Sequence, residues 1–236
     1  MRQTASFQIC VDAGEQPDLT WRALNALAPY VVAIFANSPR YDGRETGHRS
    51  FRRHIWGTLD PRRTGLLGFG DDPIEEYLQF ALDAPAFLMP DVDCVAASFG
   101  HWVASGEATA SDWCVHLSTL FPEVRPRGYF ELRSADVVAP EWYAAPLVLL
   151  AGLVYHPPNL DSVLELVGPP DRDLLVRSGR IGLHDPVLGA VAPRLCDLAL
   201  AGCTALGDDF VNHRDLASAA EYFDRYTWRG RCPADD

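Results

Sequence analysis

FELRSAD, residues 130–136, places a glutamate and an arginine two positions apart inside a run that is otherwise largely apolar. Successive side chains of a β-strand point to opposite faces of the sheet. A strand over about 128 to 134 therefore puts Glu131 and Arg133 on one face and Phe130 and Leu132 on the other. This segment predicts a strand with one apolar face and one charged face.

A second strand with the same character begins the chain. Between residues 4 and 12 the apolar Ala5, Phe7, Ile9 and Val11 alternate with Thr4, Ser6, Gln8, Cys10 and Asp12. If both strands belong to one sheet with their polar faces together, Gln8, Glu131 and Arg133 converge on a surface able to hold a divalent cation and an anion. The alternative is an exposed sheet face whose cross-strand ion pair contributes only about 0–1 kcal/mol.

The rest of the chain predicts helices joined by one long loop. A helix is expected from Asp18 until Pro39 ends it, and residues 40–73 are expected to form a long ordered loop with a short helix near 48–56. The further expected elements are a helix at 74–83, a possible strand at 86–89, a helix from a Ser111 cap to Leu120, and helices at 141–155, 159–167, 170–179, 186–205 and 214–227. This pattern predicts an α+β fold with sparse antiparallel strands and a helical C-terminal part.

Composition narrows the class of protein. The chain has 236 residues, 48% of them hydrophobic, and a net charge of −12, which opposes an extended surface for nucleic acid or anionic membranes. All 20 basic residues are arginine, so Schiff-base and P-loop lysine chemistry are excluded. Six cysteines lack a CxxC pair, the N-terminus lacks a signal-peptide core, and the apolar run 144–155 is too short to span a bilayer. We expect a cytoplasmic protein with reduced thiols.

The loop RETGHRSFRRHIW, residues 44–56, concentrates four arginines beside a tryptophan. A guanidinium next to an aromatic ring suits recognition of a carboxylate, although a solvated basic loop paired with surface acids fits the same pattern. His54 and His116 are candidate acid–base groups or, alternatively, structural histidines. The common nucleotide-binding and hydrolase motifs GxGxxG, GxxxxGKS, HExxH and GxSxG do not occur.

Six collinear segments resemble the glutamate-cysteine ligases of the plant, proteobacterial and actinobacterial type. They are TASFQICVDAG (4–14), FANSP (35–39), GHRSFRRHIWGTLDPRRTG (47–65), YLQFALDAPAF (77–87), HLSTLFPEVRPRGYFELRSAD (116–136) and RGRCPADD (229–236). The resemblance implies a single domain over 1–236 that corresponds to the C-terminal part of a glutamine synthetase-like catalytic domain, with a partial curved antiparallel sheet and substrate loop in 1–139 and a helical part in 140–236.

The resemblance also implies a reaction and its residues. ATP with Mg²⁺ would phosphorylate the side-chain carboxylate of glutamate, and the amine of cysteine would attack the acyl phosphate to give γ-glutamylcysteine for ergothioneine or glutathione synthesis. By matching motifs, Arg133 would contact the transferring phosphate as catalytic and ATP-binding residue. The other implied residues are Gln8 and Glu131 for the metal, Arg52 and Trp56 for glutamate, and Thr4 and Ser6 for the pocket lining, with Asn37 shaping it.

The resemblance further implies an N-terminal strand of GxExE type, whose glutamates supply most metal ligands and which this sequence does not contain. Three explanations are open: a fragment of a longer product, a split enzyme completed by a second chain, or a degenerate homologue. Two other functions stay open as well, namely a non-catalytic glutamate-binding or regulatory module and a ligase that uses an amine other than cysteine.

Overall fold

A three-stranded antiparallel sheet lies at the centre of the computed structural model, which describes residues 4–87 and 97–236. Its strand order is β1 (Ser6–Val11), β7 (Phe130–Asp136) and β6 (Val124–Pro126). The first strand pairs with FELRSAD, so the condition that both belong to one sheet is met, and the predicted α+β mixture of helices with small sheets is confirmed. The glutamine synthetase-like type of the sheet and the single-domain assignment stay predictions.

The β1–β7 pair contains a β-bulge. Phe7 lies opposite Ala135 and Ile9 lies opposite Leu132, so one residue of β1 faces the two residues 133 and 134 of β7. An extra residue in one strand interrupts the alternation of side chains between the two faces. The side chains of the last residues of β7 therefore point to other faces of the sheet than strict alternation from Glu131 and Arg133 predicts.

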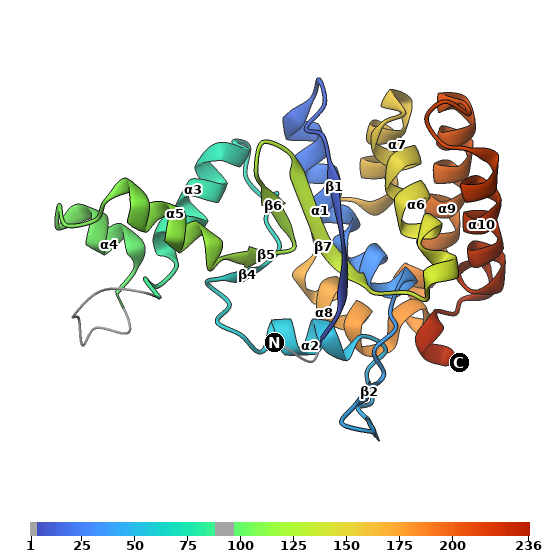
Figure 1. Ribbon diagram of the computed structural model, residues 1–236, viewed down its shortest axis with the longest axis horizontal. Coiled ribbons are helices and arrows are strands. Elements are labelled where there is room, and N and C mark those ends of the chain that lie inside the picture. Colours follow the sequence, from blue (N-terminus) through green and yellow to red (C-terminus); the bar gives the residue numbers. More distant parts are fainter. Residues whose placement is uncertain (1–3, 88–96) are drawn as a thin grey trace.

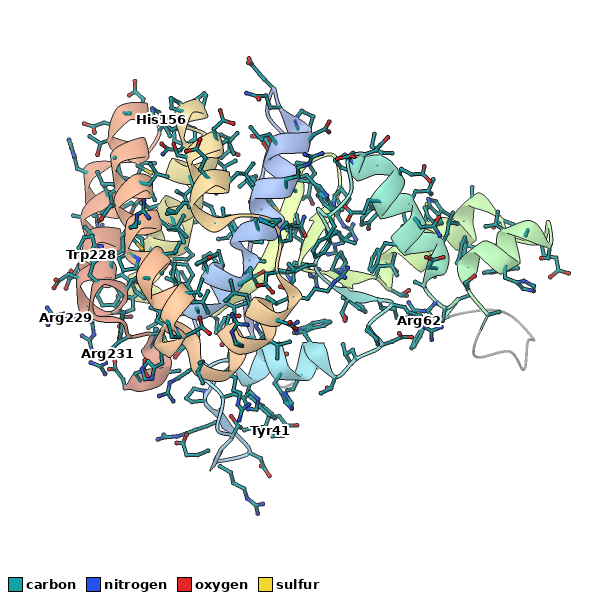
Figure 2. The ribbon with its side chains drawn as sticks, turned by 180° about the vertical axis from the view of Figure 1, so that it is seen from behind. Tyr41, Arg62, His156, Trp228, Arg229 and Arg231 are labelled. Carbon is teal, nitrogen blue, oxygen red and sulfur yellow. The ribbon has the colours of Figure 1, made fainter. Side chains whose placement is uncertain are left out.

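Helix α1 (Pro17–Ile34) covers the apolar face of this sheet, and it passes behind the strands in Figure 1 and in front of them in the opposite view of Figure 2. The helix is almost entirely buried because helices of the C-terminal part pack on its other side. It ends at Ile34 and not near Pro39, since Asn37 donates its backbone N–H to Asp136 and its side-chain amide to the carbonyl of Val137.

Residues 36–87 and 97–122 form short elements, and the expected long loop at 40–73 is itself divided into such elements. The segment 40–73 contains a hairpin that projects from the body in Figure 1, and the predicted short helix is confirmed. The elements are β2 (Arg40–Tyr41), β3 (Arg44–Glu45), α2 (Phe51–Gly57), β4 (Thr64–Gly65), α3 (Pro73–Asp83), α4 (Phe99–Ala104), α5 (Ala110–Ser118) and β5 (Phe121–Pro122).

Two predictions in this region need correction. Helix α5 is capped by Thr109, which forms a capping box with Asp112, and not by Ser111. The possible strand at 86–89 lies partly outside the described residues; residues 86 and 87 are not in a strand, and an isolated bridge joins Pro85 to Ser98.

The C-terminal part is helical, as predicted. Its helices are α6 (Ala144–Val154), α7 (Pro157–Val167), α8 (Arg172–Ile181), α9 (Pro186–Leu206) and α10 (His213–Arg225), with 3₁₀ turns at Pro140–Trp142, Gly182–His184, Thr227–Arg229 and Pro233–Asp235. Helices α6 and α9 cross so closely that a Cβ on Gly152 would overlap the backbone carbonyl of Ala199. The Asn159 amide donates to the carbonyls of Gly152 and Leu198, at 2.7 and 3.1 Å, and so joins these two helices to α7.

Helix α9 is long and apolar enough to cross a membrane by length and composition alone. The core helix of a globular protein meets the same criterion, and α9 packs against α6, α7 and α10. We therefore interpret α9 as a core helix.

Candidate active site

The face of the central sheet opposite α1 carries the charged side chains of β7 and β6. In Figure 1 this face points toward the viewer, and Trp56 of α2 and Phe121 of β5 lie against part of it. Cys10 of β1 and Arg125 of β6 both lie opposite Glu131 in the register, on either side of it. We call this surface, made of Cys10, Arg125, Glu131 and Arg133, the polar face.

Glu131 lies between two arginines. One carboxylate oxygen is 2.7 Å from Nε and 2.6 Å from Nη2 of Arg125, and the other is 3.5 Å from Nη1 of Arg133. The Glu131 side chain is only 8% exposed, so burying its charge requires such partners. Two guanidiniums around one carboxylate leave a local excess of positive charge, which suits an anionic ligand.

Arg133 extends across two aromatic rings. Its guanidinium carbon is 5.8 Å from the ring centroid of Trp56 and 5.7 Å from that of Phe121, and these two rings contact each other. Burial and, second, the neighbouring charge of Arg125 lower the pKa of Arg133, although an arginine stays charged at any physiological pH. Within residues 4–87 and 97–236 the Arg133 guanidinium has one polar partner, Glu131, at 3.5 Å from Nη1. Its other N–H groups can therefore donate to a ligand.

The bulge directs Ser134 and Asp136 toward α2. Asp136 is 2% exposed and accepts hydrogen bonds from the Asn37 backbone N–H and the hydroxyls of Ser38 and Ser50, at 2.7–2.9 Å. Its Oδ1 also lies 2.6 Å from Nε of Arg52. We call this group, Asn37, Ser38, Ser50, Arg52 and Asp136, the Asp136 cluster.

Arg52, predicted to bind glutamate, belongs to this buried cluster. It is 4% exposed, and besides Asp136 its guanidinium donates to the backbone carbonyl of Ser134. Trp56, predicted for the same pocket, lies at the polar face. The two residues lie four positions apart on the same side of α2, but the Arg52 guanidinium is already bonded within the Asp136 cluster while Trp56 faces Arg133. Direct contact of Arg52 with a substrate stays a prediction.

Thr4, Ser6 and Gln8, the polar residues predicted for the site from the start of the chain, lie at different distances from Glu131. Ser6 pairs with Asp136 at the far end of β7, four residues along the strand from Cys10, and Gln8 is exposed beside the bulge with its amide 3.4 Å from the Ser6 hydroxyl. At about 3.3 Å per residue, Ser6 is about 13 Å along the strand from Cys10, the neighbour of Glu131. Thr4 precedes β1 and is half-buried.

These residues do not by themselves fit a magnesium site. Mg²⁺ prefers oxygen ligands from carboxylates, and each carboxylate near the polar face already has an arginine partner. Glu131 pairs with Arg125 and Arg133, and Glu123 lies 3.4 Å from Nε of Arg53 and accepts from the Ser134 hydroxyl. In the described part of the chain no three side chains of the His, Cys, Asp and Glu types gather as metal ligands.

The two candidate histidines lie elsewhere. His116 is buried between α3 and α5, stacks on Phe99, and its Nε2 is 2.8 Å from the carbonyl of Ala81. This environment supports the structural interpretation of His116. His54 is exposed on the side of α2 away from Trp56 and borders a separate cavity.

Sequence reasoning missed Arg125, Phe121 and Glu123, all of which border the site. They belong to β5 and β6 or the link between them, and strands of two or three residues ending in proline give no readable alternation. One feature of the sequence could have indicated them. Glu123 and Arg125 are two positions apart, as on one face of a strand, and a turn leads from them into FELRSAD.

The chain matches one protein family over nearly its whole length. The sequence model of glutamate-cysteine ligase family 2 (GCS2) covers residues 1–235. The glutamate–cysteine ligase EgtA of Mycolicibacterium smegmatis is 36% identical over 253 residues, which cover 100% of this chain and 57% of that protein. The chloroplastic glutamate–cysteine ligase of Brassica juncea is 35% identical over 231 residues, which cover 88% of this chain and 45% of that protein. The chain spans about half the length of the curated relatives it matches.

Proposed function

Because the chain belongs to glutamate-cysteine ligase family 2, we propose that it forms the arginine-lined half of a glutamate–cysteine ligase active site. In this reaction ATP phosphorylates the side-chain carboxylate of L-glutamate, and the amine of L-cysteine then displaces phosphate from the acyl phosphate. The products are γ-glutamylcysteine, ADP and phosphate. γ-Glutamylcysteine is a precursor for thiols such as ergothioneine or glutathione, and we expect the reaction to take place in the cytoplasm.

One observation carries the proposal: two arginines from paired strands meet at Glu131 on the polar face. Phosphoryl transfer requires positive charge on the transferred group's oxygens, and preorganised donors in a water-poor site supply most of that stabilisation. Glu131 holds both guanidiniums in place, and Trp56 and Phe121 exclude water from one side of Arg133. Arg125 and Arg133 are therefore the residues we expect to bind the transferring phosphate.

Magnesium would need further carboxylates from outside the described residues, because those near the polar face are paired with arginine. The longer relatives are consistent with such a contribution, either within one polypeptide or from a second chain. We assign no step of the reaction to a metal held by this chain alone.

Replacing Arg133 with methionine tests the proposal, because methionine keeps the aliphatic stem but removes every donor. Loss of one preorganised donor to a developing charge lowers kcat by about 10²- to 10³-fold. Arg194→Met is the matched control, since Arg194 is exposed on α9 and makes no ion pair within the described ranges. ATP-dependent formation of γ-glutamylcysteine is measured by mass spectrometry after the region that the longer relatives carry in addition has been supplied, because this chain is proposed to form only half of the site. Given measurable turnover in the Arg194→Met control, equal activity of Arg133→Met and that control would refute the assignment.

Binding can be followed without turnover through Cys10, which lies on the polar face opposite Glu131. Cys10 and Cys114 are both exposed, so both react with an alkylating reagent in the folded protein. Burial and then the negative charge of Glu131 raise the pKa of Cys10, which makes a mildly alkaline buffer the suitable condition. We expect ATP with glutamate to slow alkylation of Cys10 and not of Cys114. A rate of Cys10 alkylation that is the same with and without these ligands would contradict binding at the polar face.

A non-catalytic glutamate-binding role is the second candidate, and the observation that favours it is the lack of three clustered metal ligands in residues 4–87 and 97–236. Calorimetry separates the two candidates. Glutamate binding that strengthens with ATP and Mg²⁺ supports the ligase, whereas glutamate binding that is independent of nucleotide supports the binding module.

A further inference from the structure

A second positively charged recess lies on the other side of α2, between α2 and α8. The two helices lie together in the lower part of Figure 1. The cavity has a volume of about 210 Å³, and its lining includes His48, Arg53, His54 and Arg180. None of the described residues that line it is an aspartate or a glutamate, in a protein whose net charge is −12.

Arg53 forms the inner end of this cavity. It is 8% exposed, and its Nη1 lies so close to Gly57 that a Cβ there would be 3.0 Å away. Gly179 of α8 makes room for the aliphatic stem of Arg53, since a Cβ at Gly179 would be 3.0 Å from Cγ of Arg53. Glu123 lies 3.4 Å from Nε, and no hydrogen bond within the described residues uses Nη1 or Nη2. Nη1 and Nη2 therefore remain available as donors to a ligand in the cavity.

The outer part of the cavity adds three more cationic or donor groups. The rings of His48 and His54 lie 4.3 Å apart between centroids, and burial followed by the charges of His48 and Arg53 lowers the pKa of His54. Arg180 is exposed at the end of α8 and makes no ion pair with another described residue. Two permanent positive charges with two imidazoles around one recess favour a dianion over a single carboxylate.

We propose that this cavity is a second anion site, which binds inorganic phosphate or the phosphate group of a phosphate monoester. It is distinct from the polar face, because His54 and Trp56 are two positions apart on α2 and therefore roughly 200° apart around the helix axis. The buried guanidinium of Arg53 contacts the phosphate with Nη1 and Nη2, while Arg180 and the two histidines close over it from the solvent side. This inference goes beyond the proposed ligase function and does not depend on it.

Nuclear magnetic resonance of the histidine C2–H signals tests the site directly, with inorganic phosphate added to the full chain at constant ionic strength. We expect saturable shifts of the His48 and His54 signals, and no saturable shift of the His101 signal on α4. Arg180→Ala and His54→Gln should each weaken binding at least tenfold, whereas Arg214→Ala, which removes an exposed arginine of α10, should leave it unchanged. Both test residues are exposed, so the variants should fold.

Three results would overturn the proposal. The first is a linear, non-saturating response to phosphate, which indicates only ionic-strength effects. The second is wild-type affinity in Arg180→Ala. The third is acetate or succinate binding as tightly as phosphate, which would assign the cavity to carboxylates. These signals report the cavity, whereas alkylation of Cys10 reports the polar face, so failure of one proposal is distinguishable from failure of the other.

Discussion

Replacing Asp136 with asparagine should destabilise the fold more than any other conservative change near the site. The substitution keeps the size of the side chain but removes its charge and turns one acceptor oxygen into a donor. In the Asp136 cluster the carboxylate accepts from the Asn37 N–H, from two serine hydroxyls and from Arg52. The amide NH₂ of asparagine would therefore face N–H or O–H donors of the cluster, and the Arg52 guanidinium would be buried without its counter-ion.

The magnitude follows from burial. Arg52 and Asp136 have side chains that are 4% and 2% exposed, so water cannot replace the lost partner. Removing one member of a buried ion pair costs about 3–5 kcal/mol, which is a large part of a total unfolding free energy of about 5–15 kcal/mol. Asp161→Asn is the matched control, since Asp161 is exposed on α7 and the change should lie within about 0.5 kcal/mol.

The assay is urea unfolding followed by circular dichroism, on Asp136→Asn, Arg52→Met and the double variant. Because the two residues share one interaction, the double variant should lose less than the sum of the single losses, with a coupling of about 1–3 kcal/mol. If Asp136→Asn does not fold alone, recovery of folding in the double variant carries the same information. Additive losses, or a loss below 1 kcal/mol in Asp136→Asn, would refute the reasoning.

Two further predictions concern packing and pH. Gly152→Ala should lower the unfolding free energy by about 1–3 kcal/mol or more, because the new Cβ meets the Ala199 carbonyl, and thermal unfolding measures the loss. Burial lowers the pKa of His116 below its ordinary value of 6.5, so the unfolded state binds the proton more readily than the folded state. The α3–α5 region should therefore lose stability as pH falls below 6.5. Hydrogen exchange across that pH should show faster exchange of these amides; His116→Gln should remove the effect and His101→Gln, at an exposed position of α4, should not.

The elements that the sequence predicted well share a strong local pattern. Strand β1, the start of α1, strand β7 and helices α7, α8 and α10 each repeat apolar residues at the period of their own structure, whereas α6 is an uninterrupted apolar run. Strands β4, β5 and β6 have two or three residues each, so their periodicity is too short to read and their pairing comes from tertiary contacts. Arg125 was missed with its strand.

The polar face was predicted in part. Glu131 and Arg133 share a face with residues of β1, as alternation requires, and Trp56 lies beside Arg133. The β-bulge was not predictable, because alternation carries no information about an unpaired residue. The burial of Arg52 was not predictable, because its partner Asp136 is 84 positions away in the chain and local sequence does not show such a pairing.

The Asp136 cluster has a consequence for how the chain is synthesised. Its partners are 84 to 99 positions upstream of Asp136. At about 5–20 residues per second a ribosome needs about 4–17 s to translate the 84 residues from position 52 to position 136. During that interval α1 has no β7 to cover, and its apolar surface is open to other nascent chains. A ribosome that stalls before codon 136 would therefore expose an aggregation-prone product, and we expect chaperones to bind this chain before β7 emerges.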